Sequence, residues 1–527
     1  MSITTLTVLR VLRLVSVVVV FAAITSTAAA AQSFDVVEAT IAEAHAAMRS
    51  GDLTCRALVQ AYIERIEAYD QAGPMLNTVQ TLNPRVLEEA DAKDAALERD
   101  GLTGPLHCVP VLLKDQVETG DMPTTYGSAL FKNFQSDRDA TIVVRMKEAG
   151  AIILAKTNMG EFASRYVGSA YGIIRNPYAT DRNPSGSSGG SAVGTAASLG
   201  MVSIGEDTGG SIRGPASVTN LVGLRPTLEL VSTYGMMPAN PTHDTMGPMT
   251  RTVTDAALLL DAIAGYDPND PLTAKSFGEV PDSYTELLDT RALEGARVGI
   301  IRDPMDTRTD PSSEDYTKVR AVMDRAIAQL SALGAEVIDP LEIPGLEVLG
   351  TINNSYETEQ ATNEYLAQLS DPPYTTFRDI LLSGIVNPWR SLAMWGVAGK
   401  TTDDPGYLEV MLKRDAVRTA VLKAMADHNL DALVHATFDH QPTLIALDVE
   451  TNATPKDGYG WGDNRQLSPA TGFPALTVPA GFTTDDLPVG IEFLGRPFTE
   501  GMLLSLGYAF EQATGHRRAP ASTPSIR

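Results

Sequence analysis

Two short loops rich in serine and glycine contain the residues whose types and spacing suggest chemistry. The first, Asn183–Ser191, reads N-P-S-G-S-S-G-G-S, and the second, Asp207–Arg213, reads D-T-G-G-S-I-R. Glycines allow tight turns with exposed backbone N–H groups, and a serine directly after paired glycines lies beside several of them. Such N–H groups can hold a negatively charged oxygen, so we interpret both loops as catalytic rather than as flexible linkers.

Other known arrangements around a serine or a phosphate fit this sequence less well. Residues 186–190 match the G-x-S-x-G nucleophile elbow, but the stretch before them contains prolines and charges instead of the required buried strand. No lysine has a serine three positions before it, which excludes an S-x-x-K acyl-enzyme. Gly399-Lys400-Thr401 lacks the first glycine of a phosphate loop, because Met394 occupies that position.

Alternating strands and helices must position these loops. Asp35 is the expected cap of a first helix that runs to about Met48, and a second helix is expected from about Thr54 to Tyr69. Apolar runs predict strands at 109–113, 151–154, 298–301, 433–436, 476–479 and 489–493, with helices between them at 139–149, 255–263 and 313–333. This order predicts an α/β layered fold around a mixed sheet, in which the turn-rich stretches 270–290 and 400–407 could bracket an insertion.

An ordered set of motifs resembles the amidase signature family. The set includes Lys114 at the end of P-V-L-L-K-D, the S-S-G-G-S loop and the D-T-G-G-S cluster, followed by Gly223–Thr227 and Gly247–Met249. The resemblance runs from about residue 36 to residue 515. It implies one large α/β/α domain over 32–527 around a mixed β-sheet, with a catalytic core at about 105–255.

The resemblance also implies a catalytic triad of two serines and a lysine. Ser211 is the nucleophile, Ser187 is a bridging serine preceded by a cis peptide bond, and Lys114 is the base. A lysine can accept a proton only while its amine is neutral, and burial favours that neutral form. Asp115 is therefore expected to point away from Lys114, because its charge would favour the ammonium form.

Backbone N–H groups of the second loop are expected to stabilise the oxyanion, namely those of Thr208, Gly209, Gly210 and Ser211. Asp207 and Arg213 flank this turn and are expected to orient it. The sequence departs from the commonest family pattern at Ser185 and Cys108, where glycine is frequent. Spacing does not decide whether Cys55 and Cys108 pair, and we expect two free thiols.

The N-terminal residues 1–31 have the order of a secretory signal peptide. Arg10 and Arg13 precede an apolar run at 14–24, and an Ala-x-Ala cleavage site precedes Gln32. The alternative is an uncleaved anchor helix, which this short run disfavours. We therefore expect export to the periplasm or the medium, with no stable membrane insertion after cleavage near Ala31.

Composition narrows the partners of this 527-residue chain. It has 41 Lys and Arg against 65 Asp and Glu, a formal charge of −24, which argues against a nucleic-acid partner. Two cysteines exclude multi-cysteine metal sites, and His435 and His440 lack the helical i, i+4 metal spacing. We expect no metal and no organic cofactor, and a monomer or homodimer.

The expected reaction is hydrolysis of a small-molecule amide through a seryl acyl-enzyme, with some activity on esters. The region from about 353 to 412 is expected to supply the acyl pocket, with Trp389 and Trp395 as possible lining. One alternative is the amidase-like subunit of a tRNA-dependent amidotransferase. Another is an exported, non-catalytic protein that binds amides or peptides. The sequence leaves open which amide, anilide, peptide amide or carbamate is the substrate.

Overall fold

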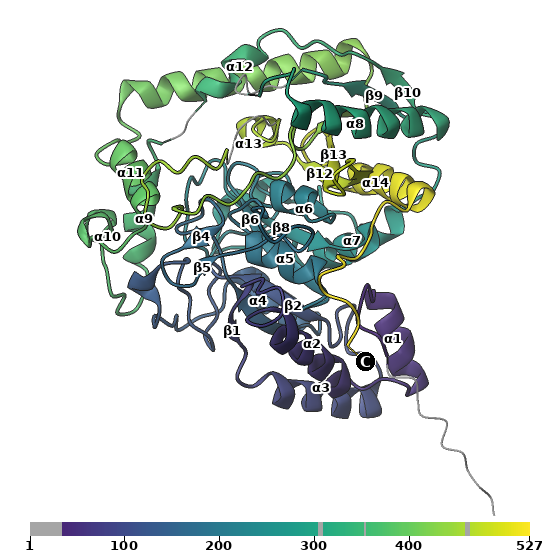
Figure 1. Ribbon diagram of the computed structural model, residues 1–527, viewed down its shortest axis with the longest axis vertical. Coiled ribbons are helices and arrows are strands. Elements are labelled where there is room, and N and C mark those ends of the chain that lie inside the picture. The colour runs from purple at the N-terminus through teal and green to yellow at the C-terminus, as the bar shows by residue number, and fades with distance from the viewer. Residues whose placement is uncertain (1–33, 304–308, 353–354, 459–463, 527) are drawn as a thin grey trace, which may run out of the picture. The chain divides into compact units, whose positions relative to one another are not determined.

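A computed structural model describes residues 34–303, 309–352, 355–458 and 464–526 (Figure 1). Asp35–Arg527 form one compact unit. The predicted signal peptide at 1–31 lies outside the described residues. In the parts of the chain that are described, no helix is both long and apolar enough to cross a membrane.

An eleven-stranded mixed sheet forms the centre of this unit. From one edge to the other its strands are β1 (Val79–Leu82), β3 (Ile152–Thr157), β2 (Pro110–Lys114), β6 (Val202–Asp207), β8 (Thr245–Thr250), β7 (Val222–Arg225), β12 (Ala475–Phe482), β13 (Pro488–Leu494), β11 (Ala432–Ala436), β9 (Arg297–Ile300) and β10 (Glu336–Ile338). β2 runs parallel to β3 and to β6, whereas β8 is antiparallel to β6 and to β7. All six predicted apolar runs are strands, and the predicted mixed sheet is confirmed. A separate small sheet pairs β4 (Val167–Gly168) with β5 (Gly172–Ile173).

Helices cover both faces of the sheet. The helices are α1 (Ile41–Ser50), α2 (Cys55–Tyr69), α3 (Val86–Asp100), α4 (Thr141–Glu148), α5 (Gly189–Ala196), α6 (Arg213–Val218), α7 (Val253–Ile263), α8 (Glu314–Ala332), α9 (Thr358–Leu366), α10 (Phe377–Leu382), α11 (Pro388–Val397), α12 (Pro405–Asp427), α13 (Leu467–Thr471) and α14 (Glu500–Thr514). On β12, Leu476 and Val478 meet Gly507 of α14, whereas Thr477 lies on the side of Ser217 of α6. Because successive strand residues face opposite sides, α14 and α6 pack on opposite faces.

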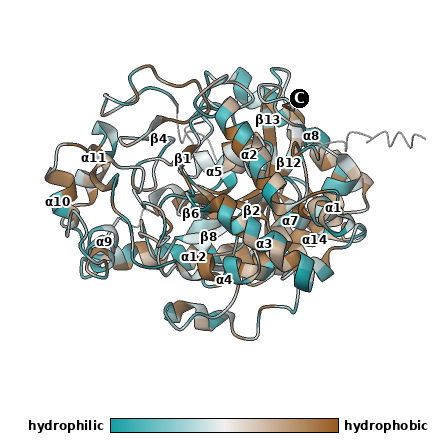
Figure 2. Ribbon diagram, turned by 90° about the horizontal axis from the view of Figure 1, so that it is seen from below, coloured by the Kyte–Doolittle hydropathy of each residue, from teal (hydrophilic) through white to brown (hydrophobic). Residues whose placement is uncertain are grey.

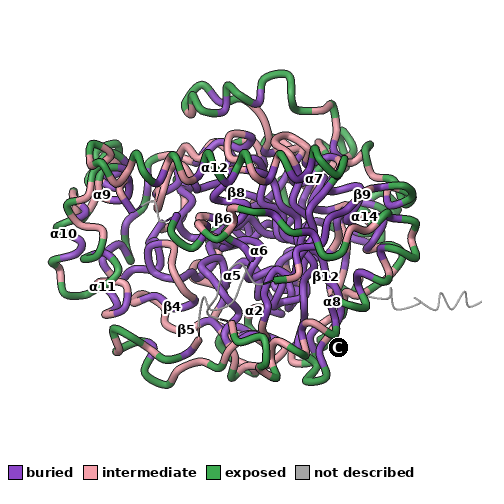
Figure 3. The backbone as a smooth tube through the Cα atoms, turned by 90° about the horizontal axis from the view of Figure 1, so that it is seen from above, coloured by how far each residue is buried: buried purple, intermediate pink, exposed green. Residues whose placement is uncertain are grey.

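The central strands are the most buried part of the unit. Every residue of β2, β3 and β6 is buried. A strand that is covered on both faces does not need the alternation of apolar and polar residues found in half-exposed strands. Figure 3 shows the buried backbone gathered in the strands and the exposed backbone in the peripheral helices and loops. Figure 2 shows the same division as hydrophobic colouring at the centre. The charged residues that nevertheless lie in these strands therefore need specific partners.

The first helix starts later than predicted. Thr40, not Asp35, caps α1: its hydroxyl accepts from the Glu43 N–H, and the Glu43 carboxylate accepts from the Thr40 N–H. This reciprocal capping box satisfies two backbone donors, whereas Asp35 only accepts from the Val37 N–H. The second helix begins after Thr54 as expected, and it ends at Tyr69.

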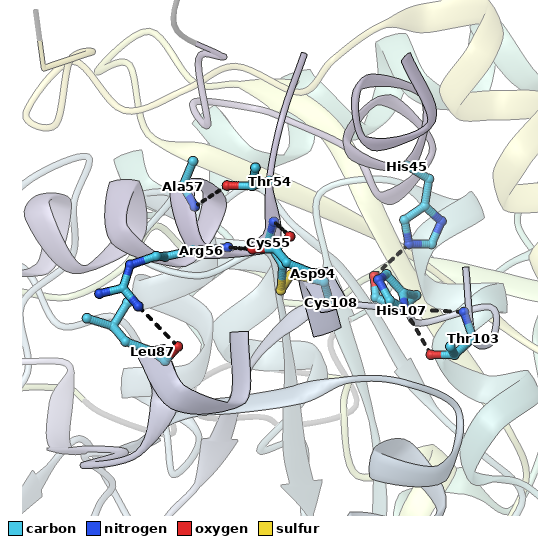
Figure 4. Close-up of a disulfide and its surroundings, with 10 residues drawn as sticks. All are labelled: His45, Thr54, Cys55, Arg56, Ala57, Leu87, Asp94, Thr103, His107 and Cys108. Carbon is cyan, nitrogen blue, oxygen red and sulfur yellow. Dashed lines mark hydrogen bonds between the residues drawn. A yellow bond between two sulfur atoms is a disulfide. The ribbon is translucent and has the colours of Figure 1, made fainter. Parts of the chain in front are cut away.

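The prediction of two free thiols is wrong. Cys55 and Cys108 form a disulfide that joins the start of α2 to the segment before β2 (Figure 4). Asp94 of α3 accepts from the N–H groups of Cys55 and Arg56, which ties α3 to the same corner. The two cysteines are separated by 53 residues, and only the packing of α2 against this corner brings them together.

Candidate active site

The three residues of the predicted triad come from loops at the ends of neighbouring strands. Lys114 is the last residue of β2, and Ser211 lies in the turn between β6 and α6. Ser187 lies in the loop that leads into α5, a helix that packs on β2 and β6. Because β2 and β6 are adjacent and parallel, their carboxyl ends meet at one edge of the sheet, where sites of α/β proteins commonly form.

Lys114 and Ser187 are in direct contact. The Lys114 amine lies 2.7 Å from the Ser187 hydroxyl, and both side chains are wholly buried. The peptide bond between Gly186 and Ser187 is cis, as expected. Ser211 is 9% exposed, so it is the member of the triad that a molecule from solvent meets first.

Close packing explains the glycine before Ser187. A Cβ atom on Gly186 would lie 1.8 Å from the Arg165 carbonyl oxygen, so no larger residue fits there. The preceding Ser185 has φ +62°, and Cys108 has φ +57°. Both are in the left-handed region that favours glycine, which explains physically why glycine is frequent at these two positions in the family pattern.

A carboxylate that the sequence analysis missed also contacts the catalytic lysine. Glu206 Oε2 lies 2.7 Å from Lys114 Nζ, and the Glu206 side chain is wholly buried. Its second oxygen accepts a 2.5 Å hydrogen bond from the Thr208 hydroxyl. Glu206 directly precedes Asp207 on a strand that is buried throughout, and a charged side chain in such a place needs a partner. This position was the sequence feature that could have indicated its role.

Opposing effects act on the Lys114 amine. Burial lowers the pKa of Lys114, and the Glu206 carboxylate acts against this shift without reversing it. Burial and the charge of Glu206 raise the pKa of nearby Asp244 well above its ordinary value.

Asp115 points away from Lys114, as expected. Its carboxylate accepts from the N–H groups of Thr125 and Gly127 at 2.9 and 3.1 Å. It also lies 3.7 Å from the amine of Lys156, a second buried lysine on β3. Asp115 is therefore engaged in a different cluster.

The predicted oxyanion donors are only partly available. The Gly210 N–H donates to Asp207 Oδ1 at 2.6 Å, so the expectation for Gly210 needs correction. The N–H groups of Thr208, Gly209 and Ser211 donate no hydrogen bond to any residue in the described ranges. Gly210 itself has φ +109°, a conformation that places the turn around Asp207.

Asp207 and Arg213 hold this turn from inside the protein. Asp207 Oδ2 accepts from the Ile212 N–H and from Arg213 Nε, both at 3.1 Å. Burial would raise the pKa of Asp207, but the guanidinium groups of Arg213 and Arg225 lower it strongly. The carboxylate is therefore charged at every ordinary pH and orients the loop, as the sequence analysis expected.

A mainly apolar cavity has two residues in its lining, Gln116 and Met159, that are close in the chain to a catalytic residue or to a contact of the catalytic loop. It is lined by Gln116, Tyr126, Met159, Phe162, Ala163, Met237, Pro238, Thr358, Thr362, Phe377, Ile380, Arg390 and Met394. The region from 353 to 412 contributes lining residues from the helices α9, α10 and α11. Neither tryptophan lines it: Trp389 packs against Tyr166, and Trp395 is exposed.

The described residues contain no group of three or more His, Cys, Asp or Glu side chains that could hold a metal ion. His435 lies in β11, and its nearest acidic group is Glu492 at 3.9 Å.

Known proteins are similar to this chain in sequence over almost their whole length. The sequence profile of the amidase family matches residues 57–504. A probable amidase of Arabidopsis thaliana is 33% identical over 514 residues, which cover 93% of this chain and 92% of that relative. A glutamyl-tRNA(Gln) amidotransferase subunit of Moorella thermoacetica is 36% identical over 475 residues, covering 87% of this chain and 93% of the relative.

A solved structure agrees with the sequence relatives. The peptide amidase of Stenotrophomonas maltophilia superposes with a TM-score of 0.81 at 34% identity, covering 92% of this chain and 99% of that protein. The extent of these matches, together with the lysine and serines at the sheet edge, identifies the family. The chain belongs to the amidase family of hydrolases, which act on carbon–nitrogen bonds.

Proposed function

We propose that the protein hydrolyses linear amides with Ser211 as nucleophile, Ser187 as proton relay and Lys114 as base. The observation that carries this proposal is the 2.7 Å contact between the Lys114 amine and the Ser187 hydroxyl at the sheet edge that also bears Ser211. A buried, neutral amine can accept a proton, which an exposed lysine at pH 7 cannot do.

In the first step the Ser211 oxygen forms a bond to the amide carbon. Its proton passes to Ser187, whose own proton moves to the Lys114 amine. The carbonyl oxygen becomes an oxyanion, and the N–H groups of Thr208, Gly209 and Ser211 are the available donors for it. Preorganised donors of this kind stabilise the transition state more than the substrate.

In the second step the carbon–nitrogen bond breaks. The leaving nitrogen takes a proton from the same relay and departs as ammonia or an amine, which leaves an acyl group on Ser211. Water then attacks the acyl carbon and gives its proton to the relay, so that the acid is released and Ser211 is restored. Esters form the same acyl-enzyme with a better leaving group and are expected as side substrates.

A single purified chain provides the decisive experiment. We expect ammonia or amine release from simple amides with no other protein added, and covalent labelling of Ser211 by a fluorophosphonate. The Ser211→Ala variant should lose both the label and turnover. Hydrolysis that appears only with partner proteins would favour the amidotransferase alternative, and binding without turnover would favour the non-catalytic alternative.

We also propose that the protein is exported. The motif order at 1–31 supports this, and so does the disulfide between Cys55 and Cys108, because disulfides persist mainly in oxidising compartments. Mass spectrometry of the protein from its native host should find a mature N-terminus near Gln32 in the periplasm or medium. An intact Met1 in a cytoplasmic fraction with reduced cysteines would contradict the proposal.

A further inference from the structure

One cation in the lining of the apolar cavity, Arg390, has no hydrogen-bond partner among the described residues. Arg390 lies on α11, is half-buried, and lines the cavity together with mainly apolar side chains. Its Nε is fully buried without a hydrogen-bond acceptor. Across the described ranges, no residue accepts a hydrogen bond from its guanidinium group. A guanidinium has five N–H donors, and leaving buried donors unused is costly.

The nearest carboxylate does not satisfy Arg390. Burial lowers the pKa of Arg390 to about 10, and the charge of Glu161 does not fully offset this effect. Arg390 is nevertheless a cation at pH 7. The two carboxylate oxygens of Glu161 accept hydrogen bonds from the Ser169 hydroxyl and from the Asn387 N–H. An anion from outside the chain would complete the arrangement.

Two other lining residues of this cavity are close in the chain to residues of the catalytic site. Gln116 follows Lys114 closely in the chain, and its buried Oε1 has no partner. At the same end, Met159 precedes Gly160, whose N–H donates to the Ser187 carbonyl oxygen at 3.2 Å. The hydroxyl groups of Thr358 and Thr362 are used within the protein. Apart from Gln116 and Arg390, the lining of the cavity is therefore mainly apolar.

We propose that Arg390 binds a carboxylate of the substrate, so that the preferred amides carry a carboxylate separated from the scissile bond by an apolar segment. Planar guanidinium groups pair with carboxylates through two parallel hydrogen bonds. The chain has a net charge of −24, which repels anions in general, so a cation within the cavity is the feature that would select them. This inference rests on the proposed amide hydrolysis.

Matched substrate pairs test the inference on the wild-type protein. One series has the carboxylate on the acyl side, as monoamides of linear dicarboxylic acids, and its controls are the linear alkyl amides of equal length. A second series has it on the amine side, as N-acyl amino acids, and its controls are the corresponding N-acyl alkylamines. We expect at least one series to exceed its controls in kcat/KM by about 10- to 100-fold, as a charge-assisted hydrogen bond allows.

An arginine variant and a matched control locate the effect. Arg390→Met should remove the preference for carboxylates mainly through KM and leave turnover of neutral amides nearly unchanged. Arg390→Lys should keep part of the preference. Arg378→Met is the control. Arg378 lies on the neighbouring α10, its side chain is 61% exposed, and it pairs with Glu359 of α9, so this variant should behave as wild type.

The outcomes separate this inference from the proposed function. Turnover of neutral amides with no preference for carboxylates in either series would overturn the role of Arg390 alone. Equal losses on charged and neutral substrates in Arg390→Met would show that Arg390 only balances Glu161. If Arg390→Met does not fold, the substrate preference of the wild type and of Arg390→Lys still tests whether Arg390 binds a substrate carboxylate. No amide turnover by the wild type would overturn the proposed function itself.

Discussion

Two buried lysines on neighbouring strands, Lys114 on β2 and Lys156 on β3, have different surroundings. In the register of these parallel strands Lys114 pairs with Thr157 and Lys156 with Leu113, so the two side chains point to opposite faces of the sheet. Lys114 contacts a serine hydroxyl and the Glu206 carboxylate. Lys156 contacts the Thr124 hydroxyl at 2.9 Å and lies 3.7 Å from Asp115.

Burial alone therefore does not make a lysine catalytic. Burial lowers the pKa of both lysines, and that of Lys156 is lowered to about 8. Only Lys114 lies within hydrogen-bonding distance of a serine at the end of β2, where the glycine-rich turns leave backbone N–H groups free. Lys156 contacts the hydroxyl of Thr124, which is wholly buried and lies outside the glycine-rich turns. Position relative to a nucleophile separates a base from a structural cation.

Replacing each lysine gives the largest expected contrast. Lys114→Ala should lower kcat/KM for amides by about 10³-fold, because general base catalysis typically contributes 10²- to 10⁴-fold. Activity on activated esters should fall less, because their leaving groups need less protonation. Lys114→Arg should not rescue amide hydrolysis, since a guanidinium stays protonated.

Lys156→Met is the matched control for that contrast. We expect less than a tenfold change in kcat/KM, but a loss of about 3 kcal/mol in the free energy of unfolding, because the Asp115 charge loses its cation. Urea unfolding and steady-state kinetics measure the two effects. Near wild-type amide turnover in Lys114→Arg would show that the base lies elsewhere, with His243 and His435 as the next candidates.

The serine beside Lys114 should be the next most sensitive position. Ser187→Ala should lower kcat for amides by about 10²-fold or more and leave a slow residual rate, because the oxyanion donors remain. Ser191→Ala is the matched variant: this buried serine on α5 contacts Thr157 at 2.8 Å and should keep most activity. If a fluorophosphonate labels Ser187 instead of Ser211, the nucleophile and relay are reversed.

Glu206 offers a smaller effect that appears in the pH profile. For an uncharged amide, kcat/KM should fall as pH drops through the lowered pKa of Lys114, because the ammonium form cannot accept a proton. Glu206 raises that pKa, so Glu206→Gln should move this acid limb to lower pH and give severalfold higher relative activity on the limb. An unchanged limb in Glu206→Gln would separate Glu206 from the protonation of Lys114.

The smallest effect on catalysis is expected at the opposite end of β2. Replacing Cys55 and Cys108 by serine should lower the free energy of unfolding by about 2 to 5 kcal/mol, because a disulfide that closes a long loop restricts the unfolded chain. The kcat/KM at 25 °C should stay within about twofold, since Lys114 is held by β3 and β6 on either side. A large loss of activity without unfolding would contradict this separation.

The predicted elements agree with the structure where their patterns are local. Six apolar runs are strands, and the loops with Ser187 and Ser211 lie where their glycines indicated turns. The strand β6 was not predicted, because its sequence V-S-I-G-E-D contains serine, glycine and two acids, although all of its residues are buried. Propensity alone could not reveal a strand whose polar residues are stabilised by Lys114 and by arginines from other elements.

The sequence by itself predicted six of the strands and the two tight loops, because these depend on residues close together in the chain, and its ordered motifs pointed to the lysine and the serines through the family resemblance. Only the tertiary structure decided which carboxylate faces which lysine. Asp115 and Glu206 are each next to a motif residue, and strand pleat and sheet register assign Asp115 to Lys156 and Glu206 to Lys114. The disulfide and the place of Arg390 in the cavity likewise join segments far apart in sequence, and such contacts depend on packing that no local pattern encodes.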